Sequence, residues 1–148
     1  MSSKFKVQSS KFFCCLSFAF FLASCGSVPN LEIGECTKAR TKVREFYSFH
    51  FGNDMKPSKE NLQTRAKFLS PQLKERLSAQ TETATDYFTA TEDYPKAFRI
   101  GECEAAGANK TVFQVVLFWK DDARSEQREI KVEAIKQNDK WLIGKVGN

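Results

Sequence analysis

The sequence is poor in the residues on which most enzyme chemistry depends. Its 148 residues include one histidine, and none of its five cysteines belongs to a CxxC pair. A serine nucleophile elbow, a metal-ligand cluster and a glycine-rich phosphate loop are also missing from the sequence. These absences argue against the common hydrolase, zinc-dependent and nucleotide-binding classes. No set of residues predicts a metal or another cofactor.

Acidic residues are absent from the first 31 positions, where Lys4, Lys6 and Lys11 precede an apolar run. The run covers the twelve residues 12–23, with Ser17 as its polar interruption. A membrane-spanning helix needs about 20 apolar residues. The basic start and the short run therefore predict a secretory signal. An ordinary signal cleaved elsewhere and an uncleaved membrane anchor are the alternatives.

The run ends in Leu22-Ala23-Ser24-Cys25, which resembles the lipobox of bacterial lipoproteins. The resemblance implies that residues 1–24 are a lipoprotein signal peptide and that Cys25 becomes the lipid-carrying first residue. Two or more acyl chains hold a protein stably at a membrane. Gly26 follows the cysteine, where an aspartate usually retains lipoproteins at the inner membrane. The resemblance thus implies a place in the bacterial cell envelope, on the outer membrane and facing the periplasm.

Processing before Cys25 changes the charge and the cysteine count. Removal of the leader takes away three lysines and lowers the formal net charge from +5 to +2. So small an excess does not predict nucleic-acid binding. Cys14 and Cys15 leave as well, so that Cys36 and Cys103 remain besides the lipidated residue. In the oxidising periplasm this pair is a candidate disulfide, and two buried free thiols are the alternative.

The remaining chain divides into a tether over residues 25–35 and one domain over residues 36–148. A helix from residue 36 ends at Gly52-Asn53-Asp54, Ser58 caps a second helix, and Ser70-Pro71 begins a third. The apolar positions at helical spacing are Ala39, Val43, Phe46, Tyr47 and His50; Leu62, Ala66 and Leu69; and Leu73 and Leu77.

From residue 97 the apolar spacing changes to two, which is typical of strands. We expect strands over 97–104, 110–120, 126–137 and 140–146, with a tight turn at Asn138-Asp139. The segment 110–120 is apolar on both faces, which predicts a central strand covered on both sides by helices or a partner. This order predicts an α+β fold in which three N-terminal helices pack on a curved four-stranded antiparallel sheet.

The strand pattern, the WLIGKV ending and the segment DYFTATEDY resemble the cystatin-like cone fold of the nuclear-transport-factor-two-like superfamily. More narrowly, residues 42–146 resemble a bacterial domain of unknown function, number 3828. The resemblance implies a sheet that wraps a long helix and leaves a pocket at its open end. Members of the superfamily use that pocket for a ligand, for catalysis or not at all.

The side chains expected near this pocket are Tyr47, His50, Asp86, Tyr87, Asp93 and Tyr94. Each of these residues also has a simpler explanation. A lone histidine on an apolar stripe, such as His50, is more often a hydrogen-bonded core residue. Asp86 suits a turn, and Asp93 suits a solvated loop. We therefore expect a non-catalytic binding module for a small ligand or an envelope protein. The alternative is an isomerase or dehydratase with a pocket carboxylate and His50 as its base.

Overall fold

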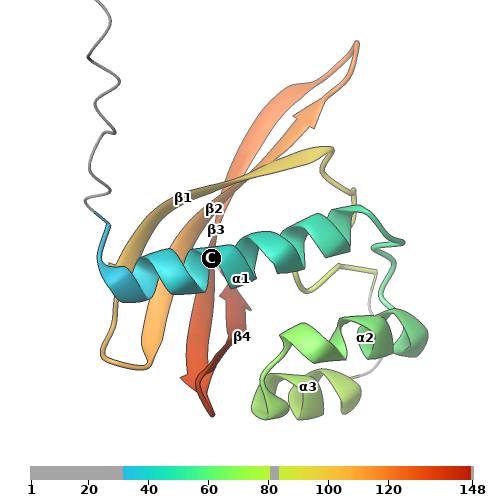
Figure 1. Cartoon of the computed structure of the whole chain (residues 1–148). Helices are drawn as coiled ribbons and strands as arrows, with labels where there is room; N and C mark the ends of the chain where they lie inside the picture. Colours follow the sequence, from blue (N-terminus) through green and yellow to red (C-terminus); the bar gives the residue numbers. More distant parts are fainter. Residues whose placement is uncertain (1–31, 81–83, 148) are drawn as a thin grey trace, which may run out of the picture. The chain divides into compact units, whose positions relative to one another are not determined.

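The computed structural model describes residues 32–80 and 84–147, with the helices first and the strands after them (Figure 1). The helical elements are α1 (Gly34–Phe51), α2 (Lys59–Arg65), the 3-10 turn η1 (Ala66–Phe68) and α3 (Pro71–Ser78). The strands are β1 (Ala97–Ala105), β2 (Lys110–Lys120), β3 (Ser125–Gln137) and β4 (Lys140–Gly147). The predicted signal peptide and Cys25 lie outside the described residues. In those residues no helix has the length and apolar character needed to cross a membrane.

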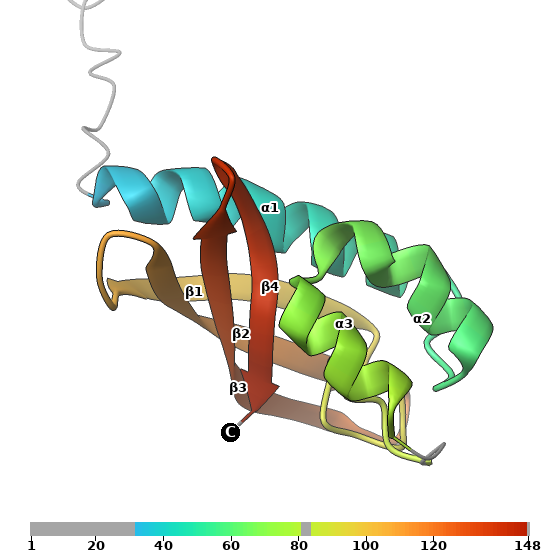
Figure 2. The same cartoon turned by 90° about the horizontal axis from the view of Figure 1, so that it is seen from below.

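The four strands form one antiparallel sheet in the order β1-β2-β3-β4 (Figure 2). Asn138 and Asp139 join β3 to β4 with φ angles of 48° and 60°. A two-residue hairpin loop with both angles positive matches the twist of the flanking strands, and asparagine and aspartate tolerate it. The predicted α+β class, with three helices before a four-stranded antiparallel sheet, is confirmed.

The core fills the space between α1 and the sheet. The apolar stripe of α1 is buried, and so are Phe113, Val115, Leu117 and Trp119 on one face of β2. The resemblance implied a pocket at the open end of the sheet; aromatic side chains fill the space between α1 and the sheet itself. The cavities described below lie at the surface of the domain.

Charged neighbours flank Val116 on the other face of β2, which the sequence predicted to be covered by helices or a partner. Val116 on this face is only 3% exposed. It stands in register between Arg99 of β1 and Glu129 of β3. Long charged side chains cover apolar neighbours with their aliphatic stems and keep their charges in water. A charged sheet surface therefore suffices to bury this valine.

The start of α1 is fixed to β1 by a disulfide between Cys36 and Cys103, the pair that the sequence singled out. Their Cα atoms are 6.0 Å apart. Arg40 adds a second clamp, since its Nε donates to both carboxylate oxygens of Glu32 at 3.0 and 2.9 Å and its Nη1 to the carbonyl of Ile100 at 3.2 Å. With these residues held, the helix begins at Gly34, within the stretch predicted as tether.

The second predicted helix is shorter than its apolar spacing suggested. α2 ends at Arg65, η1 follows, and Leu69 has an extended backbone that bridges to Ile143 of β4. Ser70 explains the change, because it caps α3 through a hydrogen bond from the Leu73 N–H to its hydroxyl at 3.1 Å. A capping residue has a non-helical backbone, so a helix cannot continue through it. Leu69 therefore belongs to the sheet edge and not to the face of α2.

Candidate functional site

His50, near the end of α1, is fully buried and uses both ring nitrogens. Its Nδ1 lies 2.7 Å from Nε of Arg65, and its Nε2 lies 2.9 Å from Oδ2 of Asp86. A guanidinium only donates, so Nδ1 accepts that hydrogen bond, and Nε2–H donates to the carboxylate. The imidazole in this arrangement is the neutral tautomer and bridges a buried cation to a buried anion.

Asp86 receives further hydrogen bonds from its own turn. Its Oδ2 accepts from the Thr89 hydroxyl at 2.7 Å, and its Oδ1 accepts from the Phe88 N–H at 3.3 Å. The Asp86 N–H donates to the carbonyl of Thr91 at 2.8 Å, and Ala90 between the threonines has a φ of 54°. The side chain is thus the turn former that the sequence suggested and also the buried anion of the network.

Arg65 supplies the positive charge of the network and is 2% exposed. Its Nη1 donates to the Asn61 carbonyl at 2.8 Å and to the Thr64 hydroxyl at 3.3 Å, and its Nη2 donates to the Asp54 carbonyl at 2.7 Å. Burial lowers the pKa of this guanidinium, while the charges of Asp86 and Asp54 raise it. Arginine stays protonated in proteins, so the cation persists.

Sequence reasoning missed Arg65, although the sequence holds a signal for it. The residue stands three positions after Leu62 and four before Leu69, on the apolar stripe of the predicted helix. A buried cation needs a partner, so a charged residue on such a stripe indicates a buried acceptor. That signal points to an internal ion network without naming the partner.

Tyr47 lies within the core close to this network. Its hydroxyl donates to the carbonyl of Phe88 at 2.8 Å. Burial raises the pKa of the Tyr47 phenol well above its ordinary value of 10.0, and the negative charge of Asp86 adds to the effect. The phenol is therefore a neutral donor that fixes the Phe88 segment.

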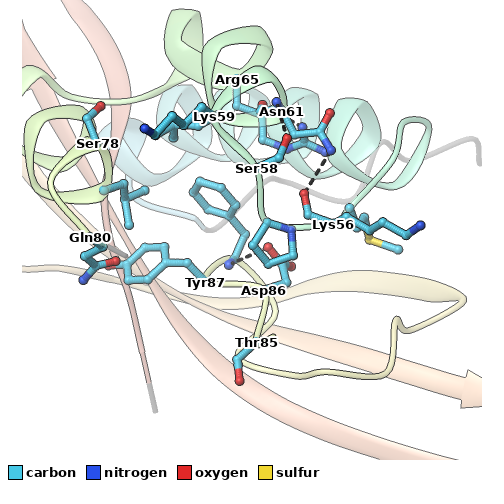
Figure 3. Close-up of a pocket in the computed structure, with 15 residues that line it drawn as sticks. Lys56, Ser58, Lys59, Asn61, Arg65, Ser78, Gln80, Thr85, Asp86 and Tyr87 are labelled. Atoms are coloured by element: carbon cyan, nitrogen blue, oxygen red, sulfur yellow. Dashed lines mark hydrogen bonds between the residues drawn. The ribbon is translucent and has the colours of Figure 1, made fainter. Parts of the chain in front are cut away.

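A surface cleft of about 90 Å³ lies between α2, α3 and residues 84–88 (Figure 3). Arg65, Asp86 and Tyr87 contribute to its lining, whereas Tyr47 and His50 do not. The other lining residues are Met55, Lys56, Pro57, Ser58, Lys59, Asn61, Leu62, Leu77, Ser78, Gln80, Thr85 and Phe88. The cleft thus has mainly apolar walls and meets the buried network through two of its three members.

Tyr87 forms one wall of the cleft and ties it to the sheet. Its hydroxyl accepts a hydrogen bond from the Val146 N–H of β4 at 3.2 Å and another from Arg76 of α3. The guanidinium of Arg76 also lies 5.5 Å from the centre of the Tyr87 ring. These contacts hold the ring in place between α3 and β4.

Asp93 is not part of this site, which corrects the sequence prediction. Its side chain is 54% exposed and forms an ion pair with Arg124, beyond the end of β2. Trp119 fixes it there, because the indole Nε1 donates to the Asp93 carbonyl at 3.0 Å. The hydrogen bond from Arg124 lowers the pKa of the Asp93 carboxyl below its ordinary value. Tyr94, half-buried, is likewise outside the lining of the cleft.

No protein-family model matches the chain, and no curated protein matches it. Among solved structures, the chain is similar to a protein of unknown function from Bacteroides thetaiotaomicron VPI-5482. The two are 16% identical, and the match covers 76% of this chain and 90% of that one at a TM-score of 0.47. A likeness of this size assigns neither a family nor a function to the chain.

Proposed function

We propose that the protein is a lipid-anchored envelope protein whose α+β domain is a non-catalytic binding module. Its ligand site is the cleft between α2, α3 and residues 84–88. The observation that carries this proposal is the composition of the cleft, which combines apolar walls with the buried Arg65 and Asp86. Ligand sites are typically concave and mostly apolar, with a few placed polar groups.

The hydrogen bonds that occupy both ring nitrogens of His50 support a non-catalytic role. A general base needs a free lone pair within hydrogen-bond reach of its substrate. The Nδ1 lone pair of His50 accepts from Arg65, its Nε2–H is given to Asp86, and the ring does not line the cleft. The isomerase or dehydratase alternative requires this histidine to act as the base, so the geometry disfavours it.

Unused hydrogen-bond capacity in the cleft suggests the chemistry of the ligand. Arg65 has five N–H groups, and four of them have acceptors among the described residues. On Asp86, Oδ1 accepts only the 3.3 Å bond from Phe88 among those residues. One donor on Arg65 and one acceptor on Asp86, two residues that line the same cleft, match an uncharged amide. We therefore infer a small ligand with a compact apolar body and one amide-like group.

The test is binding of small amides to the chain from Gly26 to Asn148, followed by NMR titration. Benzamide and butyramide serve as probes, and acetate and ethylammonium serve as charged counterparts. We expect the amides to shift resonances of residues around the cleft, such as Leu62, Leu77 and Tyr87. Equal or stronger shifts from the charged probes would contradict the proposed ligand class.

Two neighbouring tryptophan substitutions give a matched control. Ser78 and Ala79 are both exposed at the end of α3, but only Ser78 lines the cleft. Ser78→Trp should weaken amide binding severalfold because the indole occupies the cleft, whereas Ala79→Trp should leave it unchanged. Undiminished binding by Ser78→Trp would show that the probes bind elsewhere.

The anchoring part of the proposal rests on the lipobox and on Cys25. The Cys36–Cys103 disulfide also supports an oxidising compartment such as the periplasm. Cells that express the full chain should label it with a palmitate analogue, and Cys25→Ser should abolish the label. Persistent labelling of this variant would exclude lipidation at that cysteine.

A further inference from the structure

A second depression, the lysine groove, lies between α1, η1 and the β3–β4 hairpin and has a volume of about 270 Å³. It is lined by Lys38, Thr41, Lys42, Glu45, Lys67, Asp139, Lys140, Trp141 and Leu142. Four of these nine residues are lysines and two are acidic. The lysines come from three elements that are distant in sequence, so the fold itself brings them together.

The acidic residues leave much of this positive charge unmatched. Glu45 pairs with Lys42 at 2.5 Å, and Asp139 pairs with Lys136, which is outside the groove, at 3.5 Å. Among the described residues neither Lys67 nor Lys140 has a carboxylate within 4.0 Å. The ammonium of Lys67 instead lies 4.6 Å from the centre of the Phe49 ring. The groove is thus a cationic surface with two lysines outside any ion pair.

Trp141 gives an independent indication of a ligand. It is 6% exposed and lines the groove. Its buried Nε1–H has no hydrogen-bond acceptor among the described residues. Buried donors are normally satisfied, and an unsatisfied one is costly. An oxygen-rich anion is the ligand that the lysines of the groove recognise, and a shift of the indole toward the groove would give its Nε1–H an acceptor there.

We propose that the lysine groove binds the phosphate groups of anionic phospholipids and holds the domain against the membrane. This inference rests on the proposed anchoring at Cys25. Six residues, 26–31, separate that cysteine from Glu32, and they span at most about 25 Å. Lys38 lies six residues beyond Glu32, mostly in α1, which adds about 9 Å, so the chain keeps it within about 35 Å of the bilayer.

The residue before α1 has a side chain that also favours contact with a membrane surface. Ile33 is 60% exposed and is the one exposed large hydrophobic side chain among the described residues. Membrane-surface segments combine basic residues with exposed apolar ones, which enter the boundary between headgroups and acyl chains. A short tether, an exposed isoleucine before α1 and a cationic groove along the first two thirds of that helix together favour a lipid surface over a soluble anion.

The test uses the chain from Gly26 to Asn148, which carries no lipid and contains the whole compact unit of residues 32–148 with its core. It is sedimented with vesicles of phosphatidylcholine containing phosphatidylglycerol, and with vesicles of phosphatidylcholine alone. We expect binding to the anionic vesicles only, weakening as salt is raised. Near an anionic surface each lysine contributes about fivefold, so Lys38→Gln with Lys140→Gln should weaken binding tenfold or more.

The matched control is Lys120→Gln with Lys131→Gln, which removes the same charge from two exposed lysines outside the groove. This control should retain binding within about twofold, and so should Ser78→Trp, which alters only the proposed ligand cleft. Equal losses from both lysine pairs, or no binding to anionic vesicles, would overturn the groove proposal. Because the tested chain lacks Cys25, neither result depends on lipidation, and failed labelling of the full chain would overturn the anchoring separately.

Discussion

Asp86 and Asp93 are seven residues apart, and each is electrostatically matched to an arginine, yet their surroundings differ. Asp86 is 3% exposed and reaches Arg65 through the ring of His50. Asp93 has a half-exposed side chain and contacts Arg124 directly. The same two residue types thus form a buried network at one place and a surface ion pair at the other.

We infer that burial, and not the types of the paired residues, determines how much an ion network contributes to the free energy of unfolding. Water screens an exposed pair, and ordering two long side chains offsets much of its attraction. A buried charge that lacks its partner loses its hydration without gaining a compensating interaction. Asp86 is therefore expected to be indispensable to the fold, and Asp93 dispensable.

The largest effect is expected from removal of the buried carboxylate. Asp86→Ala leaves Arg65 buried without its counter-charge, so the free energy of unfolding should fall by about 3–5 kcal/mol. Urea unfolding followed by circular dichroism measures this change. Asp93→Ala, as the surface control, should change stability far less. Similar losses from the two alanine variants would contradict the role given to burial.

A smaller effect is expected from single hydroxyl groups. Thr89→Val removes a 2.7 Å hydrogen bond to the Asp86 carboxylate, so it should cost about 1.5–3 kcal/mol. Thr111 is the matched control, because it is equally buried and its hydroxyl has no partner among the described residues. Thr111→Val should therefore be neutral or stabilising in the same urea unfolding experiment. A loss as large as that of Thr89→Val would show that packing at these sites, and not the carboxylate, determines the cost.

The smallest effect concerns the pH dependence of the surface pair. The hydrogen bond from Arg124 lowers the pKa of Asp93, so the folded state holds this carboxylate ionised more strongly than the unfolded state. The stability it adds is present above the ordinary carboxyl range and disappears as the pH falls through the lowered pKa. Asp93→Asn should thus be slightly less stable than the natural chain at pH 7, and the difference should shrink as the pH is lowered through and below the carboxyl range, by thermal unfolding in low salt. A difference that grows on acidification would contradict this assignment.

The sequence was sufficient for the elements of the fold because their patterns are local. Helical spacing marked α1, spacing of two marked the strands, and Ser70-Pro71 marked the start of α3. The pairing of Cys36 with Cys103 could be suggested by counting, since the predicted processing and lipidation at Cys25 leave only these two candidates. In each case the information is held within a short segment or in a small number of residues.

The candidate site was harder to predict from the sequence, because it depends on contacts between residues that are far apart in the sequence. His50 and Asp86 are 36 residues apart, and nothing in the sequence fixes their 2.9 Å contact. Asp93 follows a turn that takes it to the far end of β2, so its closeness to Asp86 in sequence misled the prediction. The cleft includes Asp86 and Tyr87 of the expected pocket residues but not Tyr47 and His50, which are buried residues of α1.

The disulfide has a mechanical consequence if the protein is held at Cys25, as we propose. A pulling force on the chain before Glu32 enters α1 at its first turn, and Cys36 passes it by a covalent bond to Cys103 in β1. β1 pairs with β2 on both sides of an irregularity between Ile100 and Cys103, so the load passes into the sheet. The helix is then not peeled from its end, and the core beneath it stays closed while the tether is under tension.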